Sequence, residues 1–354
     1  MPVAPTLSDS EAERTRAAVA RHRAPAGRVN LAQLADDLGV RRSTAANRLR
    51  LLDIPLDTAP KFESLHLPSP DLTIEELIAR RLEDSDRSMR ADDARQIIPV
   101  KVNLNGPFGL FVMGDPHIDD QGCNFRLLKN HVELIKPHPH VVVGHIGDIT
   151  NNWVGRLARL YADQSTTARE AWLLAEWLLN EIEPLFCILG NHDMWSGHGN
   201  PIDWILRHSP GVTEAHGVRL ALRQPCGAET RVHARHNFKG TSIYNELHGL
   251  KREVLMGLRD HVLIAGHHHV GGDQGTVAPD GLVSQIVRVS GYKQADHYAK
   301  ELGLKSAHIH ASALIIIDPT EPDTSRGRAF CAPTVEKGLL ILDALRRAYE
   351  RSTE

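Results

Sequence analysis

The sequence predicts an α/β protein that carries a small, all-helical module at its N-terminal end. From residue 97 onward, short apolar runs alternate with helical stretches, which is the pattern of a sheet covered by helices. Residues 29–54 instead contain two short segments with helical spacing on either side of a glycine. The N-terminal part is also the more basic part of the chain, because nine Arg but only two Asp lie between Arg14 and Leu52.

Length and composition indicate a folded protein of ordinary globular composition. The chain has 354 residues, 42% hydrophobic and 24% charged, which predicts one large and one small globular unit and excludes general disorder. No apolar run approaches the roughly 18 to 20 residues that cross a bilayer, and the first residues lack a secretory pattern. We therefore expect a cytoplasmic protein with no membrane partner. The four cysteines form no C-x-x-C pair, so a metal would be bound through nitrogen and oxygen.

Residues 1–54 are predicted to form the helical module. Its first helix covers residues 31–38, between a favourable N-cap, Asn30, and a glycine, Gly39, that can end the helix in a left-handed turn. A second helix begins at Arg41 or Ser43 and ends near Leu52. Its inward face contains Ala45, Ala46, Leu49 and Leu52. Its outward face contains Arg41, Arg42, Thr44, Asn47, Arg48 and Arg50.

Two short helices joined by a glycine turn, the second of them basic, resemble a helix-turn-helix. The net charge between residues 14 and 52 is +7, so that the rest of the chain carries −10, and a basic module of this kind favours a DNA partner. The resemblance implies that the second helix lies in a major groove and that a homodimer forms. The candidate DNA contacts are Arg41, Arg42, Thr44, Asn47 and Arg48. The alternative is a plain helical hairpin that serves packing or dimer contact.

Residues 55–96 are predicted to be a linker with one helix. The first part contains four prolines, which disfavour regular structure. The second part, TIEELIARRLEDSDRSMRADDARQ, is charged and helical in pattern.

Residues 97–333 are predicted to form the large α/β domain. Five apolar runs are expected to be strands that each end in a polar cluster: FGLFVMGDPHID, HVVVGHIGDITNN, LFCILGNHD, RVHARHNF and HVLIAGHHH. Stretches of helical character separate the first four. SALIIID is expected to be a further strand, and residues 334–354 a C-terminal amphipathic helix. Because chemistry in α/β sheets gathers beyond the C-terminal ends of the strands, the polar clusters are the candidate site.

These clusters supply carboxylates, an amide and imidazoles in a pattern that suits metal ions. Asp115 and His117 lie two residues apart and therefore on one side of an extended chain. His267 and His269 share a side for the same reason, and His268 faces the opposite side. The other candidates are Asp148, Asn191 with His192, and either His233 or His236. This donor set exceeds what one tetrahedral ion uses and suits two divalent ions that share a bridging carboxylate.

In order, GDPHID, GDITNN, GNHD, a strand-terminal histidine and GHHH resemble the motifs of the calcineurin-like metallophosphoesterases, over roughly Val100 to Asp318. The resemblance implies a four-layer αββα sandwich with a two-metal centre between its sheets. It implies that one metal ion is bound by Asp115, His117 and His269, and that the other is bound by Asn191, His236 and His267. It also implies that Asp148 bridges the two ions and that His192 is the general acid. We favour His236 over His233 because His236 lies at the strand end, where the other ligands lie.

Neighbouring residues are candidates for supporting roles. Asn151 occupies the position at which the protein Ser/Thr phosphatases of this family have an Asp that supports the catalytic histidine, which argues against a protein phosphatase. A neutral amide orients an imidazole but stabilises its charged form less. Further residues should fix the ligand rings, and Asp193 and Asp119 are candidates because they lie near the ligands in sequence; the sequence does not pair them with particular rings. Arg156, with Arg159, is either a phosphate-binding residue or an ordinary arginine of a helix face.

We therefore expect a di-metal phosphodiesterase in which the ions activate a bridging hydroxide, and our leading hypothesis is a DNA nuclease oriented by its helix-turn-helix. The order of modules resembles metallophosphoesterases of phages and prophages, which implies a role in phage DNA metabolism or packaging. The family resemblance favours Mn²⁺, while nitrogen-rich sites also accept Fe²⁺, Zn²⁺ or Ni²⁺. The alternatives are a small-molecule or nucleotide phosphoesterase with a regulatory helix-turn-helix, and a DNA-binding phage assembly protein with a scaffold-like phosphoesterase body.

Overall fold

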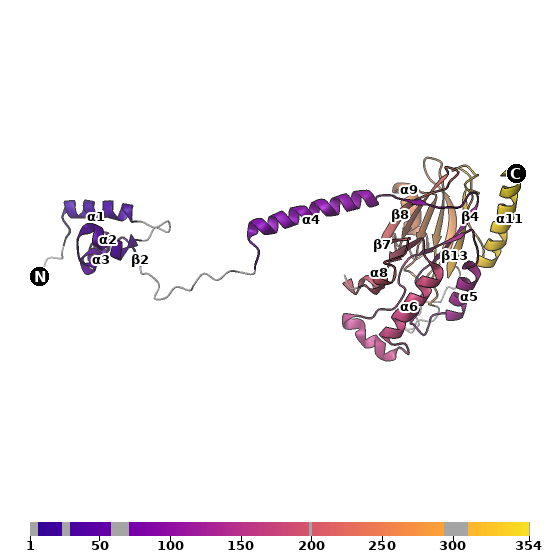
Figure 1. Ribbon diagram of the computed structural model, residues 1–354, viewed down its shortest axis with the longest axis horizontal. Coiled ribbons are helices and arrows are strands. Elements are labelled where there is room, and N and C mark those ends of the chain that lie inside the picture. Colours follow the sequence, from indigo (N-terminus) through magenta and orange to yellow (C-terminus); the bar gives the residue numbers. More distant parts are fainter. Residues whose placement is uncertain (1–5, 23–28, 58–70, 198–199, 294–310, 354) are drawn as a thin grey trace. The chain divides into compact units, whose positions relative to one another are not determined.

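The chain divides into two compact units, Met1–Arg81 and Leu82–Glu354. The computed structural model describes residues 6–22, 29–57, 71–197, 200–293 and 311–353 (Figure 1). The boundary between the units falls within α4 (Ile74–Arg95), a charged helix in which no residue is buried. Among the described residues, no helix is long and apolar enough to cross a membrane.

Three short helices make up most of the first unit. They are α1 (Asp9–Arg21), α2 (Leu31–Leu38) and α3 (Arg42–Leu51), accompanied by a parallel pair of two-residue strands, β1 (Val29–Asn30) and β2 (Leu56–Asp57). As predicted, the Asn30 side chain caps α2, and Gly39 ends it with a φ of 67°. The buried core contains Ala18, Val19, Val29, Leu34, Ala35, Leu38, Ala45 and Leu49. Burial of these apolar faces stabilises helices that would be marginal alone.

The outer face of α3 differs from the prediction at one residue. Arg41, Arg42 and Thr44 are exposed, as expected. Arg48 was predicted to point outward, but its Nη2 atom lies 2.7 Å from Oε1 of Glu11 and its side chain is only 15% exposed. The charge of Glu11 draws the guanidinium across to α1, so that Arg48 joins two helices of the unit instead of facing solvent.

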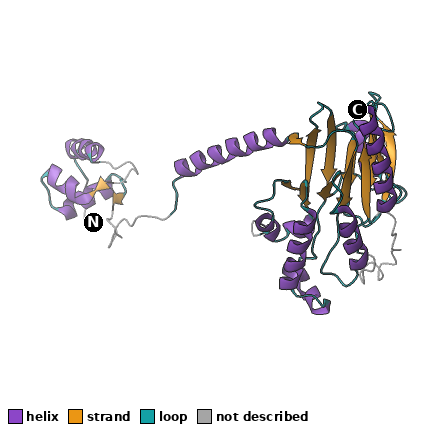
Figure 2. Ribbon diagram, turned by 45° about the vertical axis from the view of Figure 1, so that its right-hand side comes forward, coloured by secondary structure: helices purple, strands orange, loops and turns teal. Residues whose placement is uncertain are grey.

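Two six-stranded sheets form the core of the second unit (Figure 2). The first sheet has the order β14-β13-β4-β5-β6-β7. Its strands are β4 (Phe108–Met113), β5 (Val141–His145), β6 (Phe186–Leu189), β7 (Val212–Ala215), β13 (Ser312–Ile317) and β14 (Ala329–Cys331). The second sheet has the order β11-β12-β10-β9-β8-β3. Its strands are β3 (Ile98–Lys101), β8 (Gly217–Arg223), β9 (Glu229–Arg235), β10 (Val262–Ala265), β11 (Gly272–Val277) and β12 (Val283–Arg288).

The five predicted strands are present but belong to two sheets. β4, β5 and β6 are parallel neighbours in the first sheet, and β9 and β10 are parallel neighbours in the second. β7 and β8 lie where the sequence was expected to be helical, so that expectation was wrong for this region. β8 pairs antiparallel with β9, and its alternating Val218, Leu220 and Leu222 all join the core between the sheets. This alternation has the period of a strand and not that of a helix.

Side-chain alternation along the strands produces four layers. In β4, Phe108, Leu110 and Val112 belong to the core shared by the two sheets, whereas Phe111 and Met113 belong to the core beneath the helices. The helices over the first sheet are α5 (Phe125–Ile135), α6 (Ala168–Ile182), α8 (Pro201–Ile205) and α11 (Val335–Thr353). The second sheet is covered by α9 (His248–Met256). The order helix, sheet, sheet, helix confirms the predicted sandwich.

The C-terminal helix α11 is part of this packing. It contacts β13 and β4, and its Leu342 is fully buried in the core beneath the helices. Leu340, two residues earlier, faces solvent and is 69% exposed.

The two leucines provide a matched test of the role of α11. Replacing Leu342 with Ala should lower the free energy of unfolding by about 2 to 5 kcal/mol, because it removes buried methyl groups and leaves a cavity. Leu340→Ala should change it by about 0.5 kcal/mol or less. Urea unfolding followed by circular dichroism measures both values, and equal effects would show that α11 does not stabilise the sheet.

Candidate metal centre

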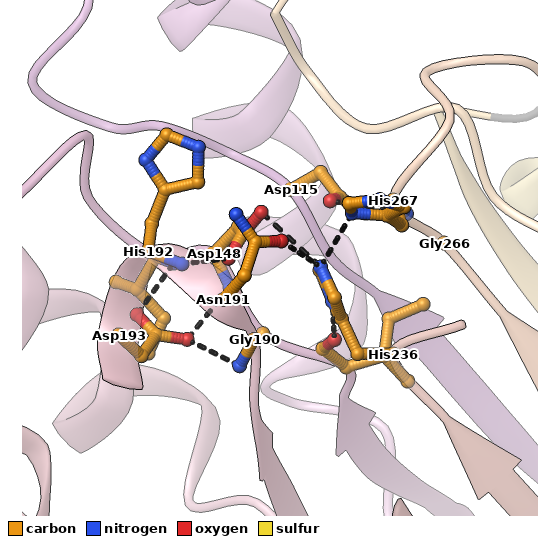
Figure 3. Close-up of polar contacts among 12 residues, drawn as sticks. Asp115, Asp148, Gly190, Asn191, His192, Asp193, His236, Gly266 and His267 are labelled. Carbon is orange, nitrogen blue, oxygen red and sulfur yellow. Dashed lines mark hydrogen bonds and ion pairs between the residues drawn. The ribbon is translucent and has the colours of Figure 1, made fainter. Parts of the chain in front are cut away.

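Polar residues converge where strands of both sheets end. Asp115 follows β4, Asp148 follows β5 and Asn191 follows β6. His236 follows β9, and His267 follows β10. Figure 3 shows all five side chains directed toward one small volume. Parallel strands in each sheet bring their C-terminal ends to the same edge, which explains why residues far apart in sequence meet here.

The turns that carry these residues have an unusual backbone. Asp115, His117, Asp148, His267 and His269 all have positive φ, between 39° and 72°. Asp and His tolerate this left-handed conformation better than most residues, although it remains sparsely populated. Five such residues in one site indicate a backbone held in place by its surroundings, as is common at binding and catalytic centres.

Two glycines allow the turns to approach one another. A Cβ atom on Gly190 would lie 2.2 Å from Oδ1 of Asp148, and one on Gly266 would lie 2.2 Å from Oδ2 of Asp115. Both distances are far shorter than any non-bonded contact, so glycine is required at each position. The glycine in each motif therefore makes room for a carboxylate from another strand.

The donor atoms fall into groups of metal-binding size. Asp115, His117 and His269 form one group, and Asp148, His236 and His267 form another; in each group the donor atoms lie within 4.8 Å of one another. Asp148 also lies within the same distance of His117, in a group completed by His192. Asp148 thus lies between the two groups, in the position that a bridging ligand occupies.

In the second group, several donor atoms lie close to Nε2 of His236. Nδ1 of His236 donates to the carbonyl oxygen of Ile146 at 2.7 Å, which directs Nε2 into the site. Nε2 then lies 3.2 Å from Oδ2 of Asp148, 3.1 Å from Oδ1 of Asn191 and 3.1 Å from Nδ1 of His267 (Figure 3). Four donor atoms directed at one point are the arrangement that a divalent ion binds.

The charges in the site favour a cation. Burial works against protonation of His236, but its hydrogen bond with Asp148 and the charge of Asp115 raise its pKa to about 10. Burial and the nearby Asp148 carboxylate raise the pKa of Asp115 to about 7. Burial also lowers the pKa of His117 well below its usual value, so that this imidazole is neutral. A proton on His236 therefore compensates the buried carboxylates when no metal ion is bound.

His117 shows the fit for a metal most directly. Its side chain is almost fully buried, and neither ring nitrogen has a hydrogen-bond partner among the described residues. Buried polar atoms without partners are rare and costly in folded proteins. A metal ion bound with Asp115 and His269 would satisfy one of these nitrogens.

Asp193, expected to support the site, acts on the backbone. Its carboxylate accepts hydrogen bonds from the N–H groups of Asp148 at 2.7 Å, Gly190 at 2.8 Å and Ile149 at 3.2 Å. Burial and the charge of Asp148 raise its pKa to about 7. Asp193 therefore joins the turns after β5 and β6, and it fixes Asp148 without touching a ligand ring.

His192 lies beside both groups and is held by the backbone. Its N–H donates to Oδ1 of Asp148 at 2.9 Å. Its Nδ1 lies 2.6 Å from the carbonyl oxygen of Asn151; because a carbonyl only accepts, Nδ1 carries the hydrogen and Nε2 remains free for other chemistry. The Asn151 side chain was expected to orient His192, but its amide donates to Asp120 and Gln164. The backbone carbonyl of Asn151, and not its side-chain amide, therefore orients His192.

Several other candidates lie outside the convergence. His233 is within β9, 3.9 Å from Oε1 of Glu253, on the face covered by α9. The structure thus places His236, and not His233, with Asp148. His268 is exposed and belongs to none of the groups of donor atoms found among the described residues. Arg156 is exposed in the 3₁₀ helix η1 (Gly155–Asp163) and forms no hydrogen bond or ion pair with another described residue.

Sequence reasoning missed four residues of the site. Asn152 donates from Nδ2 to the carbonyl oxygen of His192 at 2.6 Å. Trp153 and Trp195 place their rings against His192. Arg288 is buried and donates to the carbonyl oxygen of Gly266. One signal was present, because each tryptophan closely follows a ligand motif.

Comparisons with known proteins find weak likenesses to solved structures. A predicted phosphoesterase of Streptococcus pneumoniae matches 65% of this chain and 100% of its own, with 11% identity and a TM-score of 0.32. The NAD nucleotidase of Haemophilus influenzae matches 64% of this chain and 49% of its own, with 10% identity and a TM-score of 0.36. The nuclease MPE of Pseudomonas putida matches 63% and 87%, with 14% identity and a TM-score of 0.29.

No protein-family model matches the chain, and no curated protein matches it. At such identities and TM-scores, none of the structural likenesses supports an inference about the activity of this chain.

Binding of Mn²⁺ should strengthen as the pH rises from about 6.5 to about 8.5. Without metal, His236 has a pKa of about 10 and is protonated across this range, so the ion must displace a proton in order to bind. The affinity should rise by up to about tenfold per pH unit for each displaced proton. Calorimetric titration at several pH values measures this dependence, and an affinity independent of pH would contradict the assignment of His236 as a ligand.

Two variants serve as controls for this titration. Asp148→Asn removes the shared charge and should abolish binding of at least one ion per chain, as measured by elemental analysis. His208→Ala removes an exposed imidazole outside the site and should leave the metal content unchanged.

Proposed function

We propose that this protein is a divalent-metal phosphodiesterase that acts on DNA. The observation that carries the proposal is the position of Asp148, which lies between two groups of metal-binding side chains and also accepts a hydrogen bond from the backbone of His192. The motifs that resemble those of the calcineurin-like metallophosphoesterases fall on these same residues. The resemblance and the geometry therefore support the same chemistry.

The residues of the site match what hydrolysis of an anionic diester requires. Two divalent ions bound there would supply positive charge for the phosphoryl oxygens and would activate water. Asp115, His117 and His269 would hold one ion, Asn191, His236 and His267 the other, and Asp148 both. Mn²⁺ is the proposed ion, and the same nitrogen-rich donors also suit Fe²⁺, Zn²⁺ and Ni²⁺.

His192 is the proposed general acid. When water adds to phosphorus, the bond to the leaving oxygen breaks and that oxygen needs a proton. Protonated His192 can give this proton from Nε2, because Nδ1 is fixed on the Asn151 carbonyl oxygen. Burial lowers the pKa of His192, whereas the charge of Asp148 and the Asn151 carbonyl oppose this shift. A lowered pKa makes protonated His192 a stronger acid, but it also reduces the fraction of His192 that is protonated at neutral pH.

The first unit supports DNA as the substrate. Arg42 and Thr44 are exposed on α3, and Arg41 is exposed at its N-cap, where a helix-turn-helix would present them to phosphates and bases. Asn47 is partly exposed, and its Oδ1 accepts a hydrogen bond from Arg50. Because Arg48 is paired with Glu11, we omit it from the proposed contacts.

Replacing His192 with Ala tests the proposed activity. With Mn²⁺ bound, the wild-type protein should cleave single-stranded or double-stranded DNA, and the variant should lower kcat by about 10² to 10⁴. Metal content should stay the same, because His192 is not a proposed ligand. His208→Ala again serves as the control.

Other outcomes of this nuclease panel would contradict the proposal. Hydrolysis of mononucleotides with no cleavage of DNA would favour a small-molecule phosphoesterase. A metal-loaded protein that cleaves no phosphodiester would favour a DNA-binding protein whose body is a scaffold.

Replacing Arg42 with Ala in the full-length protein tests DNA binding separately. The loss of one phosphate contact should weaken binding to duplex DNA and reduce the slope of log K against log salt by about 0.9. Hydrolysis of a dinucleotide should be unchanged, because Arg42 is not among the proposed residues of the metal site. Fluorescence anisotropy at several salt concentrations measures the slope. Arg347→Ala, an exposed arginine on α11, should have no effect, and equal slopes for all three proteins would exclude the contact.

A further inference from the structure

Two tryptophans flank the proposed general acid. The ring centroid of Trp195 lies 4.0 Å from that of His192, at an interplanar angle of 36°. The ring of Trp153 lies 5.4 Å from His192 and 6.2 Å from Trp195, to which it is tilted by 32°. The three rings form one aromatic cluster beside the metal-binding groups.

Specific contacts hold this cluster in place. Asn152 donates from Nδ2 both to the carbonyl oxygen of His192 and to Oγ of Ser196. The turn after β5 is therefore joined to α7 (Asn191–Met194) and to the segment that follows it. Nε1 of Trp153 donates to Oε1 of Gln164 at 3.0 Å. The N–H of Trp195 donates to the carbonyl oxygen of His192 at 3.3 Å. Both indoles are therefore positioned relative to the same histidine.

The two indoles do not serve the hydrophobic core. Trp172 and Trp177 pack against the core beneath the helices, whereas Trp153 and Trp195 belong to none of the hydrophobic clusters of the described residues. Trp195 keeps 36% of its surface exposed. The Lys293 ammonium lies over the Trp153 ring, 5.8 Å from its centroid. Trp195 is thus the tryptophan that offers aromatic surface next to the general acid.

We propose that Trp195, supported by Trp153, is a stacking platform for the base of the nucleotide that leaves. This inference rests on the proposed function, because His192 protonates the leaving oxygen and its neighbours must then contact the leaving group. Every nucleobase has an aromatic face, so such a platform accepts any base and rejects leaving groups without one. The site would thereby select nucleic acid among phosphodiesters without reading sequence.

The test uses dinucleotides that differ only in the base on the leaving side. One substrate is thymidylyl-thymidine, and the others carry an abasic residue on one side or the other; the products show which side leaves. The wild-type protein should prefer the substrate with the leaving base by about 10- to 100-fold in kcat/KM. Trp195→Ala should reduce this ratio to about 1, and Trp195→Phe should retain most of it.

The ratio separates stacking from general damage to the site. A misplaced His192 would slow all substrates equally and leave the ratio unchanged, which would overturn the platform. Trp204→Ala, which removes a tryptophan that is 68% exposed on α8, should leave both rate and ratio unchanged. Elemental analysis should find equal metal content in all variants.

A binding measurement provides a second readout. Thymidine, which is the product that leaves when thymidylyl-thymidine is hydrolysed, should quench the fluorescence of the wild-type protein and of Trp204→Ala, but should quench Trp195→Ala much less. Equal quenching in Trp195→Ala would also overturn the platform. If the wild-type protein hydrolyses none of the dinucleotides, the proposed function itself fails, whereas normal hydrolysis with an unchanged ratio in Trp195→Ala refutes only the platform.

Discussion

The buried carboxylate of Asp148 is the interaction on which the rest of the site depends. It lies at the end of β5, is only 2% exposed, and contacts both His236 and the backbone of His192. A buried charge of this kind is costly unless opposite charge or hydrogen-bond donors compensate it. The neighbouring imidazoles provide this compensation in part, and a metal ion would complete it.

Much of the surrounding structure serves to hold this carboxylate and its counterpart, Asp115. Asp193 fixes the backbone N–H of Asp148. The N–H of His267 donates to both carboxylate oxygens of Asp115, at 3.1 and 3.0 Å. Glycines leave space for the two carboxylates, and the left-handed turns direct them inward. These bonds cross from one strand end to another and from one sheet to the other, so the sandwich is what keeps the acidic centre assembled.

His192 is where the metal-binding groups meet the aromatic cluster. Its backbone N–H donates to Asp148, and its ring centroid lies 4.7 Å from that of His117. Its ring also lies against that of Trp195, which is partly open to solvent. A departing group at His192 would therefore meet a proton donor and an aromatic surface together.

The sequence by itself determined which polar residues meet at the site and six of the twelve strands of the two sheets. Each motif directly follows a short apolar run, and strand C-terminal ends in α/β sheets converge, so the positions of Asp115, Asp148, Asn191 and His267 could be predicted. The preference for His236 over His233 also followed from strand geometry. Strand β8 could also be predicted from the sequence, because apolar residues alternate along it at Val218, Leu220 and Leu222.

Only the tertiary structure decided the contacts between distant segments. Local patterns cannot show that Glu11 draws Arg48 away from the outer face of α3, or that the backbone of Asn151, and not its side chain, orients His192. Nor can they show that Trp153 and Trp195, 42 positions apart in the chain, meet at one histidine. The physical reason is that sequence periodicity fixes which face of an element is buried, whereas side-chain partners depend on how the turns after different strands pack together.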